Sequence, residues 1–180
     1  SFGASSLSAP SKGLECEVRV LPVNDAPVIS APMQLVVDED EPVELRGIFV
    51  TDVDVLEAEG SLLLFRASTE TGVLKFAHGS MSATATSARW GVKFLDGIEG
   101  NNLRAEGGLA RLNQAIQSLF WVPPADWSGT ATVDFFVHDF GNCGTGGALN
   151  ATSTTTIVVR PSNDAPTAVY EINGTKILSF

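Results

Sequence analysis

The tetrapeptide Asn-Asp-Ala-Pro occurs twice in this chain, at residues 24–27 and again at residues 163–166. The two copies are 139 positions apart, and each follows a strand-like segment that ends in proline, at Pro22 and Pro161. A boundary motif that returns at a long spacing is typical of tandem repeats. A repeat of about 140 residues is long enough to bury its own core. We therefore predict the C-terminal strand of a preceding repeat at 1–23, one complete repeat at 24–162 and the start of a following repeat at 163–180.

The charge balance limits the classes of partner. The sequence has 21 Asp and Glu against 11 Lys and Arg, which gives a net charge of −10. Nucleic acid is not expected as a partner, because phosphates are bound by basic surfaces. The acidic balance is compatible with divalent cations. We also expect no membrane span in this segment, because no apolar run reaches the required length of about 18 residues.

Short stretches rich in β-branched and aromatic residues alternate with Gly, Pro and Asp, which predicts a β fold. In the clearest strand, 130–139, a period of two places alternate residues on one face and His138 on the other. The predicted core face of this strand holds Ala131, Val133, Phe135 and Val137. The other predicted strands are 29–37, 43–50, 62–67, 73–76, 89–95 and 153–160, with 62–67 and 73–76 paired as a hairpin.

One segment follows a helical period instead. Its apolar residues are Leu109, Leu112, Ile116 and Phe120, and polar residues, Asn113 among them, fall on the other side. Glycines precede the segment and Pro123 follows it, so we predict a short amphipathic helix at about 109–120. Together these features predict an all-β fold, an Ig-like or cadherin-like antiparallel β-sandwich with one short helix.

Acidic residues are concentrated at the ends of predicted strands. Residues 38–41 form an acidic run, Asp52 and Asp54 form a D-x-D, and Asp139 ends the clearest strand. Calcium takes six to eight oxygen ligands from carboxylates, amides and carbonyls. Alternatively these residues are solvated turn residues, because Asp and Asn favour turns. We expect calcium as a cofactor.

This arrangement resembles the cadherin-like and immunoglobulin-like tandem repeats of large extracellular proteins, over residues 24 to 164. In those families an acidic linker ending in Pro joins successive sandwiches, and an early Glu, a D-x-D and a late Asp accompany it. The resemblance implies candidate calcium ligands at both poles of the sandwich. Beside the preceding linker these are Asn24, Asp25, Asp52, Asp54 and Asp139, and beside the following linker Glu39, Glu41, Asn163 and Asp164.

The sequence departs from true cadherins in lacking their D-R-E element and their fuller D-x-N-D-N linker. Residues 108–123 look like the L-N-x-A-L-x-x-L-x-Y-x-P stretch of giant microbial and algal surface-protein repeats. That looser family implies one or two weaker ion sites at each joint.

The resemblance implies an extracellular or cell-surface location. Its expected partners are neighbouring repeats of the same chain, with homotypic or heterotypic protein contacts in a fibre. The sequons at Asn150 and Asn173 agree with secretion. Cys16 and Cys143 are candidates for disulfide bonds whose partners are unknown. Alternatively Cys16, which alternates with Val18, is a small buried side chain.

The expected function is that of a structural or adhesive repeat in an extracellular filament, stalk or cell-surface protein, with joints stiffened by calcium. An alternative is a carbohydrate- or protein-ligand-binding sandwich that uses Trp90, Trp121 or Trp127, although a packing role is favoured for the last two. An enzyme is not expected. The sequence has no Gly-x-Ser-x-Gly motif, and the glycine-rich stretch 141–147 lacks the Gly-Lys-Ser/Thr of a phosphate loop. We predict a flexible hairpin loop for that stretch.

Overall fold

The computed structural model describes residues 16–55, 60–77, 91–141, 144–164, 168–172 and 175–179, with the backbone alone for the last two ranges. These residues form an Ig-like antiparallel β-sandwich with one short helix, α2 (Leu109–Ile116), as predicted. Within the described residues, no helix is long and apolar enough to cross a membrane.

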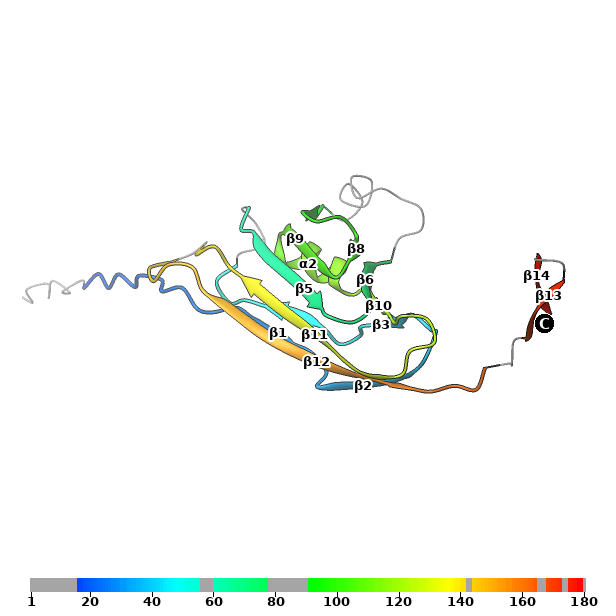
Figure 1. Cartoon of the computed structure of the whole chain (residues 1–180). Helices are drawn as coiled ribbons and strands as arrows, with labels where there is room; N and C mark the ends of the chain where they lie inside the picture. Colours follow the sequence, from blue (N-terminus) through cyan, green and yellow to red (C-terminus); the bar gives the residue numbers. More distant parts are fainter. Residues whose placement is uncertain are drawn as a thin grey trace, which may run out of the picture.

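Two layers of strands make up the sandwich (Figure 1). The larger layer is a six-stranded sheet in the order β2 (Gln34–Asp38), β12 (Asn150–Arg160), β11 (Gly129–His138), β5 (Leu63–Thr69), β9 (Asn102–Gly107), β7 (Lys93–Phe94). The second layer contains a four-stranded sheet in the order β3 (Val43–Glu44), β10 (Leu119–Val122), β6 (Val73–Phe76), β8 (Glu99–Gly100). A separate two-stranded sheet pairs β1 (Val28–Ser30) with β4 (Phe49–Thr51). The chain continues into a separate hairpin of β13 (Ala168–Ile172) and β14 (Thr175–Ser179).

The core lies between these layers, and β11 shows how the sequence builds it. Ala131, Val133, Phe135 and Val137 are at most 3% exposed, so the predicted period of two is confirmed. Phe135 stacks on Phe65 of the neighbouring strand, with ring centroids 6.0 Å apart. From the opposite layer, side chains of β6 and β10 complete the same cluster, among them Leu74, Phe76 and Trp121.

Two predicted strands are each split by a short break. Residues 29–37 are observed as β1 and β2, separated by a segment that contains Pro32, which has no N–H to donate to a ladder. Residues 43–50 are observed as β3 and β4, separated by a turn at Gly47, whose φ is +80°. Glycine adopts this left-handed backbone without the steric penalty of a side chain.

The predicted hairpin of 62–67 and 73–76 is wrong, because β5 and β6 lie in different sheets. The chain crosses between the layers at residues 70–72, and the indole N–H of Trp121 donates to the carbonyl of Thr71 at 2.8 Å. Gly72 has a φ of +79°, and a Cβ there would lie 2.5 Å from the carbonyl oxygen of Val122. The crossover is therefore fixed by close contact with β10.

The helix ends earlier than predicted, at Ile116 instead of about residue 120. The hydroxyl of Ser118 donates to the carbonyl of Ala115 at 2.7 Å, and Leu119 then begins β10. Pairing of β10 with β6 satisfies the backbone of Leu119 and Phe120 in a ladder, so these residues join the sheet.

Helix α2 also covers the edge of β4 that has no neighbouring strand among the described residues. Leu112, Ala115 and Ile116 are fully buried on its inward face. Asn113, predicted on the polar side, donates from Nδ2 to the carbonyl of Val50 and accepts from the Val50 N–H at Oδ1, both at 2.8 Å. This side-chain amide takes the place that a neighbouring strand would occupy beside β4.

The chain reaches and leaves the sandwich at opposite poles (Figure 1). Residues 16–27 arrive at the pole where β11 ends, and residues 161–164 leave from the pole where β2 ends. Strands β2 and β12 run parallel, with Thr156 opposite Gln34 and Arg160 opposite Asp38, so both point toward the second pole.

Candidate functional site

Five of the predicted ligands meet at the pole where the chain arrives, and we call them the upstream cluster: Asn24, Asp25, Asp52, Asp54 and Asp139. Two come from the linker, two from the turn after β4, and one directly follows β11. The placement implied by the family resemblance is therefore the observed one. Asp52, Asp54 and Asp139 reach this pole because β4 and β11 end there.

Asp139 is the buried anchor of the upstream cluster, with 1% of its surface exposed. Its Oδ2 accepts a hydrogen bond from Asn24 Nδ2 at 2.7 Å. Its Oδ1 accepts from the backbone N–H groups of Gly141 and Leu149, at 2.9 and 2.7 Å. Burial alone would raise the pKa of Asp139, but the hydrogen bonds from Asn24, Leu149 and Gly141 outweigh it and lower the pKa. This carboxyl is therefore ionised at neutral pH.

Asp52 and Asp54 extend the cluster toward the linker. The N–H of Asp54 donates to Oδ1 of Asp52 at 2.9 Å, and the N–H of Asp25 donates to Oδ2 of Asp54. Among the described residues, no group donates to the other carboxylate oxygen of Asp52, Oδ2, which is buried. Burial raises the pKa of Asp52, the hydrogen bond from Asp54 opposes this, and the charges of Asp139 and Asp54 raise it further. A cation beside this oxygen would offset both effects.

The glycine-rich loop, described at residues 144–147, is hydrogen-bonded to the linker at the same pole. Thr145 accepts from the N–H of Asn24 at 2.8 Å and donates its own N–H to the carbonyl of Pro22 at 3.0 Å. Gly144 has a φ of +78°, and a Cβ there would lie 2.8 Å from the oxygen of Pro22. We predicted a flexible hairpin loop, but its described part, 144–147, is bonded to the linker and helps to fix its direction.

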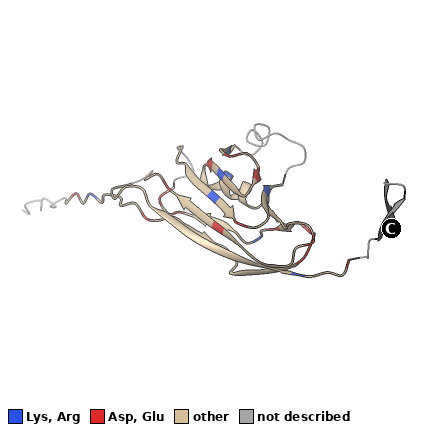
Figure 2. Cartoon of the chain, in the orientation of Figure 1, with Lys and Arg blue, Asp and Glu red and all other residues tan. Residues whose placement is uncertain are grey.

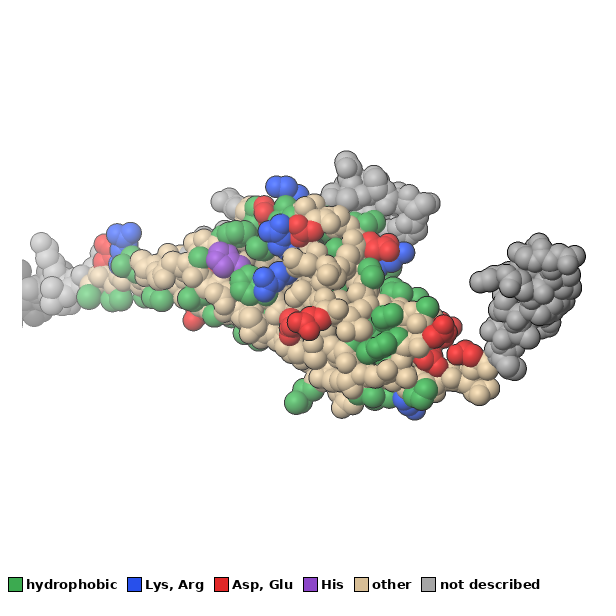
Figure 3. Space-filling model, viewed as in Figure 1, with side chains coloured by type: hydrophobic (Ala, Val, Ile, Leu, Met, Phe, Trp, Pro, Cys, Tyr) green, Lys and Arg blue, Asp and Glu red, His purple; other side chains and the backbone are tan. Residues whose placement is uncertain are grey.

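A second group of acids, the downstream cluster, lies at the opposite pole and consists of Glu39, Asp40 and Asp164. Their carboxylate oxygens all lie within 4.8 Å of one another. Glu39 is 8% exposed and accepts a hydrogen bond from the N–H of Ser162 in the departing chain. Figure 3 shows acidic side chains gathered where residues 161–164 leave the sandwich, and Figure 2 marks the acidic positions along the backbone there.

The downstream cluster differs in part from the residues selected by sequence. Glu39 and Asp164 are together as predicted, whereas Glu41 is exposed and outside the group, and Asn163 is exposed beside it. Asp40 takes the third position, because its φ of +67° turns the chain after β2. Its carboxylate also accepts from the N–H of Asp126 at 2.8 Å. Asp tolerates this left-handed backbone better than most residues, and this preference is the sequence signal that could have identified Asp40 as the turn residue.

The donor chemistry of both clusters fits a hard cation. Carboxylates are oxygen ligands of the kind that calcium prefers. At the downstream cluster they come from sandwich and linker together. At the upstream cluster the carboxylates come from the sandwich, and the linker contributes N–H donors to Asp139 and Asp54. The buried, unpartnered oxygen of Asp52 is the observation that favours an ion at the upstream cluster. At the downstream cluster it is the crowding of three carboxylates.

The predicted disulfide and glycosylation residues are only partly described. Cys16 is exposed with a free thiol, so the alternative prediction of a buried side chain is wrong. Residues 16–22 have no sheet beside them, and Val18 and Val20 are 78% and 84% exposed. Asn150 is exposed at the start of β12. Cys143 and Asn173 lie outside the described residues.

The tryptophans do not form an exposed platform for sugars in the described chain. Trp121 is fully buried, and Trp127 packs edge-on against it with ring centroids 6.3 Å apart. The packing role favoured by the sequence is confirmed for this pair. Trp90 lies outside the described residues.

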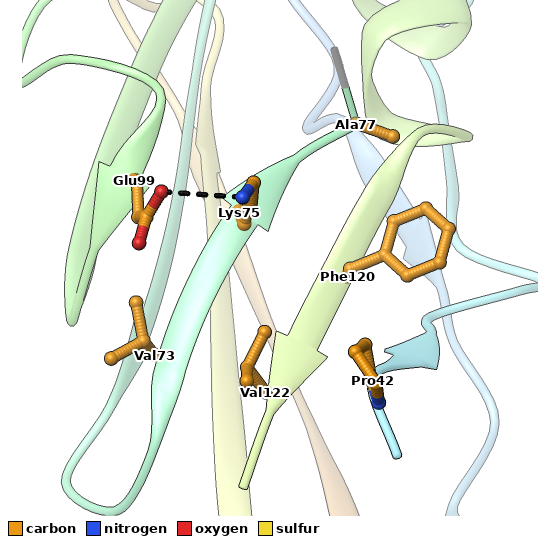
Figure 4. A pocket seen from close by; sticks show the side chains of 7 residues that line it. All are labelled: Pro42, Val73, Lys75, Ala77, Glu99, Phe120 and Val122. Atoms are coloured by element: carbon orange, nitrogen blue, oxygen red, sulfur yellow. Dashed lines mark ion pairs between the residues drawn. The ribbon is translucent and has the colours of Figure 1, made fainter. Parts of the chain in front are cut away.

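A shallow groove of about 580 Å³ lies on the outward face of the four-stranded sheet (Figure 4). Lys75 and Glu99 form an ion pair of 3.5 Å across it. Its remaining lining is mostly apolar and comprises Pro42, Val73, Ala77, Phe120 and Val122. This lining includes no histidine, cysteine or serine.

No protein-family model and no curated protein matches the sequence. Among solved structures, the chain is similar to the ASH / PapD-like domain of human CEP192 (PapD-like domain 7), with a TM-score of 0.36 and 7% sequence identity. The similarity covers 87% of this chain and 100% of that domain. A likeness this distant does not bear on function.

Proposed function

We propose that this chain is a structural repeat of an extracellular tandem array, with no catalytic role, and that calcium stiffens the joints between its sandwiches. The observation that carries the proposal is the position of the repeated linker. One copy completes the upstream cluster at one pole, and the other copy leaves the opposite pole beside Glu39. Each joint would then combine two sets of acids. The preceding sandwich would supply its equivalent of Glu39, and the following sandwich its equivalents of Asp52 and Asp54.

The electrostatics of the described residues support a role for a cation in this joint. Asp52, Asp54 and Asp139 are close enough for their charges to raise the pKa of Asp52, so their mutual repulsion disfavours the linked arrangement. Bound calcium would supply positive charge between linker and sandwich. The chain contributes the carboxylates, and a rotated Asn24 amide would present its oxygen to the same site.

A thermal melt of residues 1–180 in excess EGTA and in a calcium series tests the proposal. Extracellular modules of this kind bind calcium at about 10⁻⁴–10⁻³ M. At about 10 mM calcium, binding to the folded state alone would stabilise it by about 1.4–2.7 kcal/mol. We expect the midpoint to rise by about 3–10 °C. An unchanged midpoint would reduce the acids to solvated turns and reject the proposal.

A double variant locates the site. We expect Asp52→Asn with Asp54→Asn to abolish most of the calcium-induced rise while the sandwich stays folded in EGTA. Because the pKa of Asp52 is raised, removal of its charge should not lower the midpoint without calcium. Glu17→Gln with Glu70→Gln removes the same charge from exposed positions outside both clusters and is the matched control. If the Asp52 and Asp54 variant binds calcium as well as the control, the assigned ligands are wrong.

A further inference from the structure

The sequon at Asn150 lies on the outward face of the six-stranded sheet. Asn150 is the first residue of β12 and sits directly opposite His138 of β11, and Thr152 sits opposite Phe136. Both sequon side chains are exposed. Directly opposite residues in an antiparallel pair have Cβ atoms about 4.5–5.5 Å apart. A group attached to Asn150 Nδ2 would therefore begin within reach of the His138 ring.

Three rings form a row on this face beside Asn150. Phe136 stacks on His138, with centroids 6.4 Å apart and planes inclined by 21°. Phe140 meets His138 edge-on, with centroids 4.9 Å apart. The guanidinium of Arg66 lies 5.0 Å from the centroid of Phe136. Figure 3 shows a histidine at the surface with hydrophobic and basic side chains next to it, and His138 is the histidine of the described residues.

Phe140 is in a costly conformation that core packing does not explain. Its φ is +59°, a left-handed backbone that costs a residue with a side chain about 1 kcal/mol or more. Its side chain is 46% exposed and lies against His138, outside the core. The turn itself would be satisfied by glycine at this position. The ring is therefore kept at the surface next to the sequon at some expense in stability.

We propose that Asn150 carries an N-linked glycan and that the first sugar packs on the ring row of Phe136, His138 and Phe140. The proposal rests on the extracellular location proposed above. The donor would be a polyprenyl-diphosphate-linked oligosaccharide. Asn150 Nδ2 forms a bond to C1 of the sugar, the bond from C1 to the diphosphate breaks, the polyprenyl diphosphate leaves, and the amide nitrogen loses one proton.

The row has the chemistry to hold a sugar. The C–H face of a pyranose is apolar and packs on aromatic rings, whereas its edge is lined with hydroxyl groups that need hydrogen-bond partners. His138 Nδ1 accepts from the N–H of Phe140 at 3.1 Å, so the neutral imidazole keeps its proton on Nε2. That N–H and the guanidinium of Arg66 are donors for the sugar's hydroxyl and acetamido oxygens.

The test uses the full chain with Asn173→Gln, so that Asn150 is the remaining sequon asparagine. The protein is secreted from cultured cells that attach N-linked glycans, and its glycan is trimmed to one N-acetylglucosamine. Peptide mass spectrometry should find this sugar on Asn150. The trimmed protein should melt about 2–4 °C higher than the same chain made without glycans in bacteria.

Variants separate packing on the rings from attachment alone. Phe140→Gly removes one ring and suits the left-handed backbone, so the fold is retained. In Phe140→Gly, and in Phe136→Ala as a second variant, the rise in midpoint caused by the sugar should be lost. Val158→Ala alters the same outward face eight positions along β12 and should keep the rise.

An unmodified Asn150 in the secreted chain overturns the modification site. Packing of the sugar on the rings is overturned if the sugar raises the midpoint of Phe140→Gly and Phe136→Ala as much as that of the parent. It is also overturned if the sugar does not raise the midpoint of the parent. The calcium series uses the chain made without glycans in bacteria, so failure of the joint proposal and failure of the glycan proposal are observed separately.

Discussion

The amide of Asn113 replaces a missing strand, and its removal should be among the most damaging polar substitutions in the sandwich. Asn113→Ala leaves the N–H and the carbonyl of Val50 without their partners, although Val50 is only 1% exposed. Each buried backbone group left unpaired costs about 1–3 kcal/mol, and the higher helix propensity of alanine returns about 0.5 kcal/mol. The expected loss for the two groups is about 1.5–5.5 kcal/mol, which lowers the melting midpoint by about 3–22 °C.

The measurement is a thermal melt combined with hydrogen exchange at the Val50 amide, which should lose its protection. Gln114→Ala is the matched control, because Gln114 is the next residue of α2, is exposed, and accepts a long hydrogen bond of 3.5 Å from Arg111 on the helix surface. If Asn113→Ala melts within about 2 °C of that control, the amide does not support β4 and the reasoning fails.

A second substitution tests the geometry of the same two bonds. In Asn113→Asp, the ionised carboxylate can still accept from the Val50 N–H but faces the Val50 carbonyl with no proton to donate. Partial burial and this carbonyl should raise the pKa of the introduced carboxyl. Because a raised folded-state pKa favours the protonated form, stability relative to the parent should recover as pH falls from about 7 to about 3.5. A deficit independent of pH would refute the bidentate arrangement.

Two further predictions concern the pole where the chain arrives. Gly144→Ala should break the hydrogen bonds between the 144–147 loop and the linker, because the added Cβ would lie 2.8 Å from the carbonyl oxygen of Pro22. Hydrogen exchange at the Asn24 amide should then accelerate, while amides of the core stay protected. The lowered pKa of Asp139 contributes stability that is present above the ordinary carboxyl pKa of about 3.9 and is lost as pH falls through the lower folded value. Asp139→Asn should therefore flatten the acid limb of a plot of midpoint against pH, and an unaltered limb would show that this carboxyl does not carry the effect.

The features that could be predicted from the sequence are those set by local pattern. Strand β11 follows from its period of two. The meeting of the D-x-D with the linker is implied by the resemblance to tandem repeats and not by local pattern alone. The two-residue strands β7 and β8 are too short to show a period. Leu119 and Phe120 satisfy a helical and an extended pattern equally, so the end of α2 depends on the pairing of β10 with β6.

The remaining misses depend on contacts between distant segments. The sheet to which β6 belongs is decided by its pairing with β10, so a hairpin with β5 was the natural local expectation. The role of Asn113 requires the position of Val50, which is 63 residues earlier in the chain. Asp40 joins Glu39 and Asp164 through a positive φ that the sequence permits but does not require. Local composition cannot supply these relationships.

The parallel pairing of β2 with β12 determines how a pull along the chain would reach the fold. The first long strand of the sandwich and its last strand are direct neighbours, and they are joined by five registered residue pairs from Gln34 and Thr156 to Asp38 and Arg160. Tension between the arriving and departing chain would draw these strands past each other along their length. Their ladder would then be loaded all at once in shear, instead of being opened one pair at a time from an end.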